Sequence, residues 1–290
     1  GIERVTKLMM PALIALLLVL AVRATTLPGA AEGLAYYLRP DFSRLLDPMV
    51  LLAALGQAFF SLSLGMGAML TYGSYLSKRS SIVSAACWVV LLDTSMALLA
   101  GFIIFPSGFS IAGFDPSASG PGLIFTVLPR LFATLPGGQL FGAGFFVLLT
   151  MAALTSTISL LEVPVAHFID VHRWPRRRAV LLVTTAVFLI AIPSALGNGA
   201  VATLGTLPGL GIDFLTVMAT VWNEFALPIG GLLTAVFVGW IWRADQAITE
   251  VQLHGTAFPG QHVWSFLIRW VCPAAIAVII GFAVYTVASA

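Results

Sequence analysis

Long apolar runs separated by short polar stretches dominate this 290-residue chain. A helix needs about 20 apolar residues to cross a bilayer, and seven runs reach or approach this length. They cover residues 8–22, 48–75, 82–106, 140–169, 179–196, 209–242 and 264–287. The runs are continuous, whereas the strands of a membrane barrel show segments of about ten residues with alternating polarity. The pattern therefore predicts an all-α, polytopic membrane helix bundle.

Polar and small residues interrupt the second of these runs, which contains GQAFFSLSLGMGAMLTYGSY at residues 56–75. The interrupting residues are Gln57, Ser61, Ser63, Gly65 and Gly67. Each glycine costs about 1 kcal/mol of helix stability relative to alanine, so we expect an unwound turn at residues 61–67. Unwound backbone is tolerated at membrane depth only inside protein or beside a wet cavity, which makes the turn a candidate binding site. The alternative is close helix packing through the small pair Ser61 and Gly65.

The third run contains one carboxylate, Asp93, in the sequence VVLLDTSMALLAG. No basic residue lies within two helical turns of it in sequence. A carboxylate at this depth costs several kcal/mol unless it binds a cation, faces water or becomes protonated. Asp93 is therefore a functional candidate, and the alternative is a protonated aspartate that is hydrogen-bonded to a neighbouring helix.

A polar stripe lies within the fourth run, in the sequence MAALTSTISLLE. Its members recur at helical spacing and are Ala152, Thr155, Ser156, Ser159 and Glu162. Hydroxyl and carbonyl oxygens suit a hard cation such as Na⁺, although Ser and Thr also bond to carbonyls of their own helix. An interrupted helix, a lone aspartate and an oxygen-rich stripe together are typical of ion-coupled secondary transporters.

Two further segments depart from simple spanning helices. The connection 107–138 is rich in Gly, Pro and Ser but contains LIFTVLPRLFATL, so we expect a re-entrant or capping hairpin of short helices. In the sixth run, Pro228 followed by Gly230 and Gly231 permits a kink. Glu224 in the same run is a functional candidate.

Composition and charge agree with a membrane protein. Hydrophobic residues make up 59% of the chain and charged residues 9%, against about 25% charged residues in soluble domains. Cys87 and Cys272 each lie inside an apolar run, which suggests neither a disulfide framework nor a zinc site. We expect the lipid bilayer as a partner and no nucleic acid.

Basic residues predict the orientation. With the N-terminus inside, the densest basic motif, WPRRR at residues 174–178, lies on the cytoplasmic side. Only four arginines then fall outside, namely Arg23, Arg39, Arg44 and Arg130. Because cytoplasmic loops carry an excess of Lys and Arg, we expect a multi-pass protein of the plasma or inner membrane with a cytoplasmic N-terminus.

Three motifs resemble the neurotransmitter:sodium symporter family, which has the LeuT-type fold. Residues 56–75 resemble the sixth transmembrane helix of that family, and ALTSTISLLE at residues 153–162 resembles its eighth. The opening GIERVTKLMMP resembles the start of the fifth helix. In it, Gly1 and Pro11 match a G-x9-P arrangement that the family associates with unwinding at the inner sodium path, so both are expected to act in gating.

The resemblance implies a site that is shared by an amino acid and two Na⁺ ions. The positions that match the substrate pocket are Phe60, Ser61, Ser63, Met66, Ser156 and Leu160. Ser61 and Asp93 match ligands of the first sodium, while Ala152, Thr155 and Ser156 match the second, with Ala152 acting through its carbonyl. Chloride dependence is not expected, because Ala97 stands where a serine completes the chloride site.

Two departures from the family pattern matter. The outer-gate acid does not align cleanly: Asp213 lies too far before Pro228, and the expected spacing falls near Met218 or Ala219. The chain also has counterparts of helices five to eleven but none of helices one to four, which supply the other half of both sodium sites. We therefore expect a single but partial transporter domain over residues 1–290, with the missing helices in the same or a separate chain.

The predicted function is sodium-coupled symport of an amino acid by alternating access, without enzymatic activity. An apolar pocket lined by Phe60, Met66 and Leu160 favours a hydrophobic or aromatic L-amino acid. One alternative is a non-transporting subunit that supplies this half to a separately encoded first half. Another is an intramembrane hydrolase that pairs Asp93 with Asp213 or Glu162, which requires two carboxyls close enough to share a proton.

Overall fold

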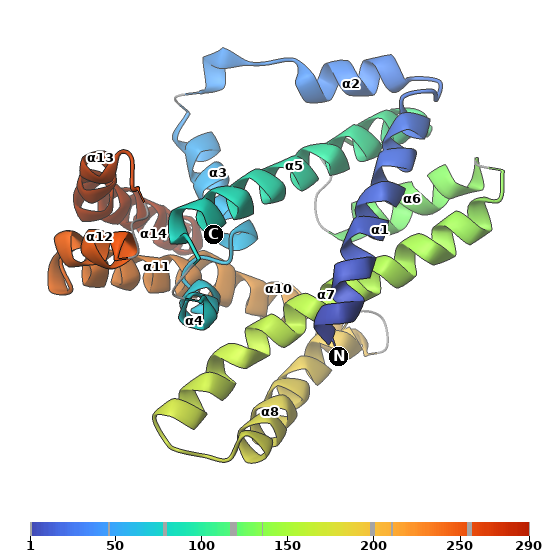
Figure 1. The fold of residues 1–290 in the computed structure, drawn as a ribbon. Coiled ribbons are helices and arrows are strands. Elements are labelled where there is room, and N and C mark those ends of the chain that lie inside the picture. The colour runs from blue at the N-terminus through green and yellow to red at the C-terminus, as the bar shows by residue number, and fades with distance from the viewer. Residues whose placement is uncertain are drawn as a thin grey trace. The chain divides into compact units, whose positions relative to one another are not determined.

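The computed structural model describes residues 2–45, 47–77, 80–116, 121–134, 136–197, 201–209, 211–253 and 257–289. Within these residues, all regular secondary structure is helical (Figure 1), which confirms the predicted fold class. Gly1, one of the two predicted gating residues, lies outside the described residues.

The helices follow one another along the chain with short connections (Figure 1). Their bounds are α1 Ile2–Ala24, α2 Ala30–Leu38, η1 Phe42–Arg44, α3 Pro48–Ser61, α4 Ala68–Tyr75, α5 Ile82–Phe109, α6 Pro121–Ala133, α7 Gly138–Asp170, α8 Arg176–Gly197, α9 Ala202–Gly205, α10 Phe214–Ala219, η2 Thr220–Ala226, α11 Leu227–Val236, η3 Phe237–Ile241, α12 Ala244–Gln252, α13 Gln261–Phe266, η4 Leu267–Val271 and α14 Cys272–Ser289. The segment η1 is a 3₁₀-helix, and η2, η3 and η4 are π-helices with wider turns.

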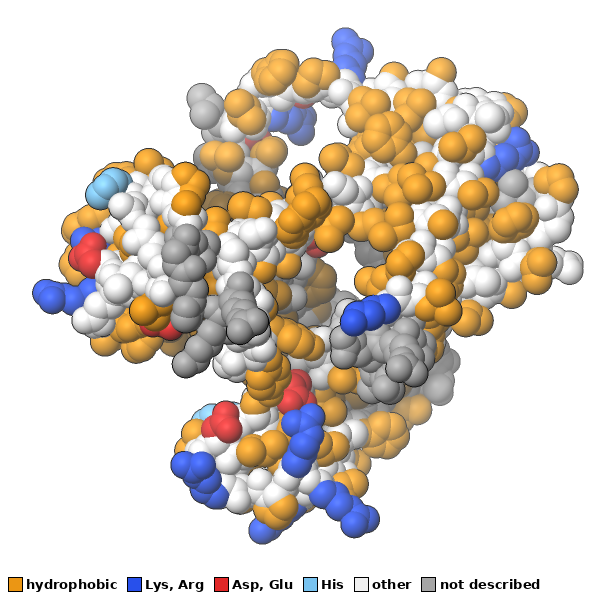
Figure 2. All heavy atoms as spheres, viewed as in Figure 1, with side chains coloured by type: hydrophobic (Ala, Val, Ile, Leu, Met, Phe, Trp, Pro, Cys, Tyr) orange, Lys and Arg blue, Asp and Glu red, His pale blue; other side chains and the backbone are white. Residues whose placement is uncertain are grey.

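Six helical stretches among the described residues are long and apolar enough to cross a membrane. They are Lys7–Ala24, Ile82–Phe109, Gly138–Asp170, Arg176–Gly197, Phe214–Ile241 and Gln261–Tyr285. These correspond to six of the seven predicted runs, and the remaining run, residues 48–75, is divided between α3 and α4. Figure 2 shows hydrophobic side chains over much of the visible surface, with Lys and Arg gathered around the turn between α7 and α8.

The chain forms two compact units. The first unit comprises Gly1–Arg44 and Val90–Ile158, and the second comprises Leu45–Val89 and Ser159–Ala290. Helices α5 and α7 therefore contribute residues to both. The single transporter domain over residues 1–290 stays a prediction.

The core of the first unit explains the apolar run in the connection 107–138. Helix α5 continues to Phe109, and α6 follows as a 13-residue helix. One face of α6 is buried, with Leu131 and Phe132 packed against Leu20 of α1 and Ile103 of α5. Among the described residues of this connection α6 is the only separate helix, so the structure has one packed helix where we expected a hairpin of short helices.

Helix α2 was not predicted, because its nine residues are too short to span a membrane. It lies against the C-terminal end of α5, where backbone meets backbone. A Cβ at Gly29 would be 2.7 Å from the carbonyl oxygen of Phe109, and one at Gly33 would be 2.6 Å from that of Phe105. Tyr37 adds a ring stacked on Phe105 at 4.9 Å between centroids. The two glycines spaced four apart were the signal in the sequence.

In the second unit, α11 packs against α3 and α14. The irregularity that we expected at Pro228 is a π-helix one turn earlier, η2, rather than a break. The amide of Leu227 bonds to the carbonyl of Trp222, five residues back. Because Pro228 has no amide proton and its ring crowds the preceding turn, the helix widens before it.

The basic turn between α7 and α8 is also well packed. Trp174 stacks on Phe168 with 4.7 Å between ring centroids, and the guanidinium of Arg178 lies 4.7 Å from the Trp174 ring. Beneath the turn, Val165 of α7 packs against Ala179 and Val183 of α8. This local core joins the end of α7 to α8 within the second unit.

Candidate functional site

The helix interruption between α3 and α4 is the centre of the candidate site. Helix α3 ends at Ser61, and α4 begins at Ala68. The end of α3 is closed by two backbone bonds, from the amide of Leu64 to the carbonyl of Phe59 at 2.9 Å and from Ser63 to Phe60 at 3.1 Å. This is the bond pattern of a Schellman cap, and it confirms the predicted unwound turn.

Three residues of the turn have left-handed backbone conformations. Ser63 has φ 55°, and Gly65 and Gly67 both have φ 78°. Glycine adopts this conformation at no steric cost, which explains the choice of residue at two of the three positions. Ser63 is the exception, and a non-glycine residue in this conformation is an observation that accompanies functional sites.

Four of the predicted substrate residues lie on this turn or directly before it. Phe60 is 53% exposed at the end of α3, and Ser61, Ser63 and Met66 are half-buried. Of the small pair considered for helix packing, Gly65 lies against the backbone of α11. Unwinding and close packing are therefore combined at one place rather than being alternatives.

Beside the turn, α3, η2, α11 and α14 enclose a groove of about 510 Å³ within the second unit. Its walls are mostly apolar and include Phe60 and Phe282, while Gln57 and Asn223 contribute amide groups. Asn223 was not among the predicted site residues. Its signal was a polar side chain in the middle of an apolar run.

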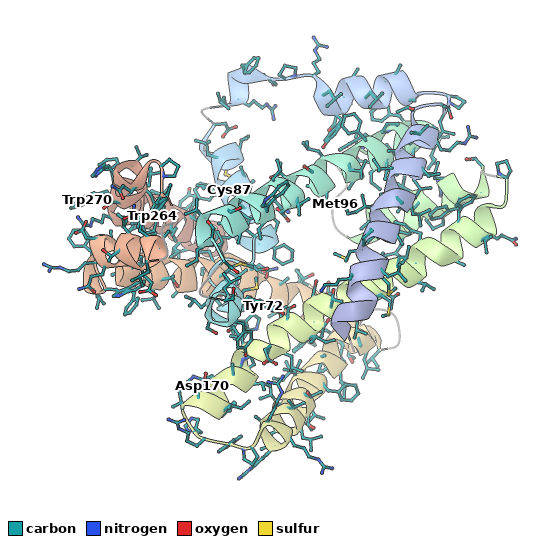
Figure 3. The ribbon with its side chains drawn as sticks, viewed as in Figure 1. Tyr72, Cys87, Met96, Asp170, Trp264 and Trp270 are labelled. Carbon is teal, nitrogen blue, oxygen red and sulfur yellow. The ribbon has the colours of Figure 1, made fainter. Side chains whose placement is uncertain are left out.

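Helix α4, on the other side of the turn, is anchored to α7 and α8 by side chains. The hydroxyl of Tyr72 donates to Ser159 Oγ at 2.6 Å (Figure 3), and the hydroxyl of Tyr75 donates to Glu162 Oε1 at 3.0 Å. Arg176 grips the same carboxylate with two bonds of 2.9 and 2.8 Å. Ser159 and Glu162, the C-terminal members of the predicted polar stripe, therefore hold α4 in place.

The N-terminal members of the stripe, Ala152, Thr155 and Ser156, belong to the first unit. They are the residues predicted for the second sodium. The hydroxyl of Thr155 donates to the carbonyl of Ala152 at 2.7 Å. This is the helix back-bonding that we considered as an alternative, and it brings two of the predicted oxygen ligands together. Ser156 is exposed on the next position of the same helix. Na⁺ binding by these residues stays a prediction.

The remaining predicted residues are distributed over both units. Asp93 is half-buried in α5 and belongs to the first unit, whereas Ser61 belongs to the second. Leu160 is exposed on α7 in the second unit. Pro11 lies inside α1 and is exposed.

Asp213 is the N-cap of α10. Its carboxylate accepts hydrogen bonds from the Thr216 amide at 2.8 Å and the Thr216 hydroxyl at 2.7 Å. The hydroxyl bond, followed by the amide bond, lowers the pKa of Asp213 below its ordinary value. The capping role by itself explains why an aspartate occupies this position. The assignment of Asp213 as the outer-gate acid stays a prediction.

Comparison with known proteins decides the family. Over residues 1–290, the chain matches the family described as the sodium:neurotransmitter symporter family. The chain belongs to this family. An uncharacterized sodium-dependent transporter of Bacillus subtilis, YhdH, is 38% identical over 280 residues, which are 96% of this chain and 61% of the relative. A second uncharacterized sodium-dependent transporter, from Haemophilus influenzae, is 38% identical over 282 residues, 96% of this chain and 60% of the relative.

A solved structure agrees with this membership. The crystal structure of MhsT in complex with L-phenylalanine superposes with a TM-score of 0.87 at 43% sequence identity, and the match covers 98% of this chain and 63% of MhsT. The fold is therefore the LeuT-type helical bundle of a multi-pass membrane protein. Since the family consists of transporters and not enzymes, the hydrolase alternative is wrong. The chain spans about 60% of the length of these two bacterial relatives.

Proposed function

We propose that the protein carrying this chain is a sodium-coupled symporter of a hydrophobic or aromatic L-amino acid. The observation that carries the proposal is the interruption of the helix at residues 62–67, with left-handed backbone at Ser63, Gly65 and Gly67. In secondary transporters, discontinuous helices provide the backbone and side-chain oxygens that bind substrate and coupling ion. Membership of the sodium:neurotransmitter symporter family supports the coupling ion.

In this proposal the chain provides one share of two sodium sites. Ser61 and Asp93 take part in the first, and Ala152, Thr155 and Ser156 in the second. Hard oxygen donors of this kind suit Na⁺. Because the first Na⁺ lies beside the substrate, each raises the affinity for the other by the same factor. The family resemblance assigns the remaining ligands to a first helix without a counterpart in these 290 residues.

The substrate class follows from the side chains at the turn. Phe60, Met66 and Leu160 would provide an apolar and adaptable wall, with Ser61, Ser63 and Ser156 beside it. L-Phenylalanine in the MhsT structure supports an aromatic substrate. We further propose independence from chloride, because of Ala97, gating through Gly1 and Pro11, and a cytoplasmic N-terminus in the cell membrane.

Binding of labelled L-phenylalanine to the purified native protein, with and without Na⁺, tests the function. We expect Asp93→Ala to reduce the Na⁺ affinity by more than about a hundredfold, since even changes outside the ligand shell cost about 10- to 100-fold. Ser95→Ala on the same helix is the matched control, because its hydroxyl donates within the helix, to the Leu91 carbonyl at 2.7 Å. Replacing chloride by gluconate should change nothing.

Two results would contradict the proposal. Wild-type protein that binds no hydrophobic amino acid in Na⁺ would remove the substrate class, and equal Na⁺ stimulation in wild type and Asp93→Ala would remove the first sodium site. For the second result, a melting temperature like that of the wild type would show that Asp93→Ala is folded.

A further inference from the structure

The turn at residues 62–67 meets α11 backbone to backbone. A Cβ placed on Gly230 would overlap the carbonyl oxygen of Gly65, and a Cβ placed on Gly65 would overlap the carbonyl oxygen of Leu227. The Cβ on Gly65 would also lie 2.9 Å from the amide nitrogen of Gly231. The approach is therefore reciprocal, and neither glycine can carry a side chain unless the backbones separate.

Gly231 makes a second contact of the same kind with a side chain. A Cβ there would overlap Cε1 of Phe59 and lie 2.9 Å from its Cζ. Phe59 is the residue whose carbonyl accepts the 2.9 Å bond from Leu64 that closes the end of α3. The ring thus packs on α11 directly before the turn, and the Gly65 backbone packs on α11 within it.

We propose that Gly230 and Gly231 form a seat that positions the turn for substrate and Na⁺ binding; this rests on the function proposed above. They are positioning residues, which touch Gly65 and Phe59 and act on the ligands through Ser61 and Ser63. A binding site must hold its groups within about 0.5 Å of the productive geometry. Because an unwound turn has no ladder of helical bonds to fix it, contact with a rigid neighbouring helix provides this accuracy.

The π-helix η2 fits this role. It lies directly before α11 and ends at Ala226, and the fully buried Pro228 follows it. A π-turn adds one residue to a helix, and one residue corresponds to a rotation of about 100°. The widened turn therefore sets which face of α11 meets the turn at residues 62–67, and the face presented is the glycine pair.

Alanine substitutions test the seat. In Gly230→Ala we expect the affinities for L-phenylalanine and Na⁺ to fall by about tenfold to a hundredfold, since displacements near 1 Å have effects of this size. Gly73→Ala in α4 and Gly281→Ala in α14 are matched controls, because a Cβ at either position meets nothing within 4 Å. Alanine favours helix over glycine, so the controls should bind normally with unchanged or higher melting temperatures.

A rescue experiment separates the seat from a general loss of packing. Gly231→Ala meets the ring of Phe59, so the double variant Gly231→Ala with Phe59→Leu should regain most of the lost affinity. Gly230→Ala meets backbone, so Phe59→Leu should restore none of it. Equal rescue of both variants, or wild-type affinity in Gly230→Ala, would overturn the proposal.

Hydrogen exchange of the amides at residues 62–67 provides a readout that does not depend on transport. In Gly230→Ala these amides should exchange faster than in the wild type and in Gly73→Ala. If the wild-type protein binds no amino acid but the exchange responds as expected, the proposed function fails and the seat remains. Unchanged exchange in Gly230→Ala would contradict the positioning role of Gly230 and Gly231, whatever the protein transports.

Discussion

Two regions of the second unit depart from the α-helix in different ways. The first is the turn at residues 62–67, and the second is the pair of π-helices η3 and η4, which pack against each other. Both regions leave backbone groups without the regular helical bond, which is costly away from water. They differ in what takes the place of that bond.

In the π-helical pair, side chains bind the displaced carbonyls. Arg269 Nε donates to the carbonyl of Gly239 at 3.2 Å, and Trp240 Nε1 donates to the carbonyl of Arg269 at 3.1 Å. Arg269 also pairs with Asp245 at 3.0 Å. Figure 3 shows Trp270 beside this crossing, where its ring lies 4.8 Å from that of Trp240. Each partner is large and fills the space next to the irregular backbone.

In the turn, the supporting contact is steric, and it is made on glycines of α11. The backbone of Gly65 packs against Gly230 and Leu227, and Ser61 and Ser63 are small residues of the same segment. The comparison teaches that an irregular helix closed by large donors is structural, whereas one supported by glycine and lined with serine leaves room for a ligand. Two variants test this distinction, and a third, at Asp213 outside both regions, tests a helix cap; they follow from the largest expected effect to the smallest.

Gly65→Ala should have the largest effect. The new methyl group would occupy the left-handed conformation at φ 78° and overlap the Leu227 carbonyl. We expect Na⁺-dependent binding of L-phenylalanine to fall by more than about a hundredfold. Gly67→Ala has the same φ but meets only Cγ1 of Val163, at 2.9 Å, so its loss should be smaller. Wild-type binding in Gly65→Ala would break the comparison.

Arg269→Met should lower stability and spare binding. It removes the donor to the buried Gly239 carbonyl, and an unpaired buried acceptor costs about 1–3 kcal/mol. Thermal unfolding should show the loss, while the affinity of the remaining folded protein stays at the wild-type value. Arg177→Met, an exposed arginine, is the control. A hundredfold loss of affinity in Arg269→Met would place a ligand role at the π-helical pair as well.

Asp213 should give the smallest effect, and it should depend on pH. Hydrogen bonds from Thr216 lower the pKa of Asp213 in the folded protein below its ordinary value of 3.8. The ionised carboxylate therefore stabilises the fold at pH above 3.8, and this contribution disappears as the pH falls through the lowered pKa.

The comparison is with Asp213→Asn, which keeps the N-cap but does not titrate. The difference in melting temperature between the two proteins should be constant near neutral pH and shift against the wild type in acid. A difference that does not change with pH would mean that the carboxylate has no such coupling to folding.

The sequence was sufficient for features that depend on local composition. The long helices followed from apolar length, and the interruption followed from Gly65, Gly67 and the serines before them. The π-helices η3 and η4 could not be predicted, because their carbonyls are bound by Arg269 and Trp240, each of which lies on the other helix of the pair. For η2, Pro228 indicated an irregularity but not its π-helical form. Helix α2 was missed for a related reason, since its position depends on how closely Gly29 and Gly33 approach α5.

For the candidate site, the sequence predicted residue types better than their contacts. The polar stripe on α7 was recognised as one feature, yet Ser159 and Glu162 bind Tyr72, Tyr75 and Arg176. Periodicity shows that residues share a helix face, but it does not show which neighbour covers each part of that face. The resemblance to the sodium:neurotransmitter symporters supplied the ligand roles that periodicity alone left open.

The reciprocal contact of Gly65 and Gly230 also limits how this protein can evolve. A lineage that acquires a side chain at either position must first move α11 away, and that intermediate would have a misplaced turn. Selection would therefore remove either change, and replacing both glycines would add a second overlap with backbone without relieving the first. Both positions should accordingly remain glycine in proteins that keep this packing.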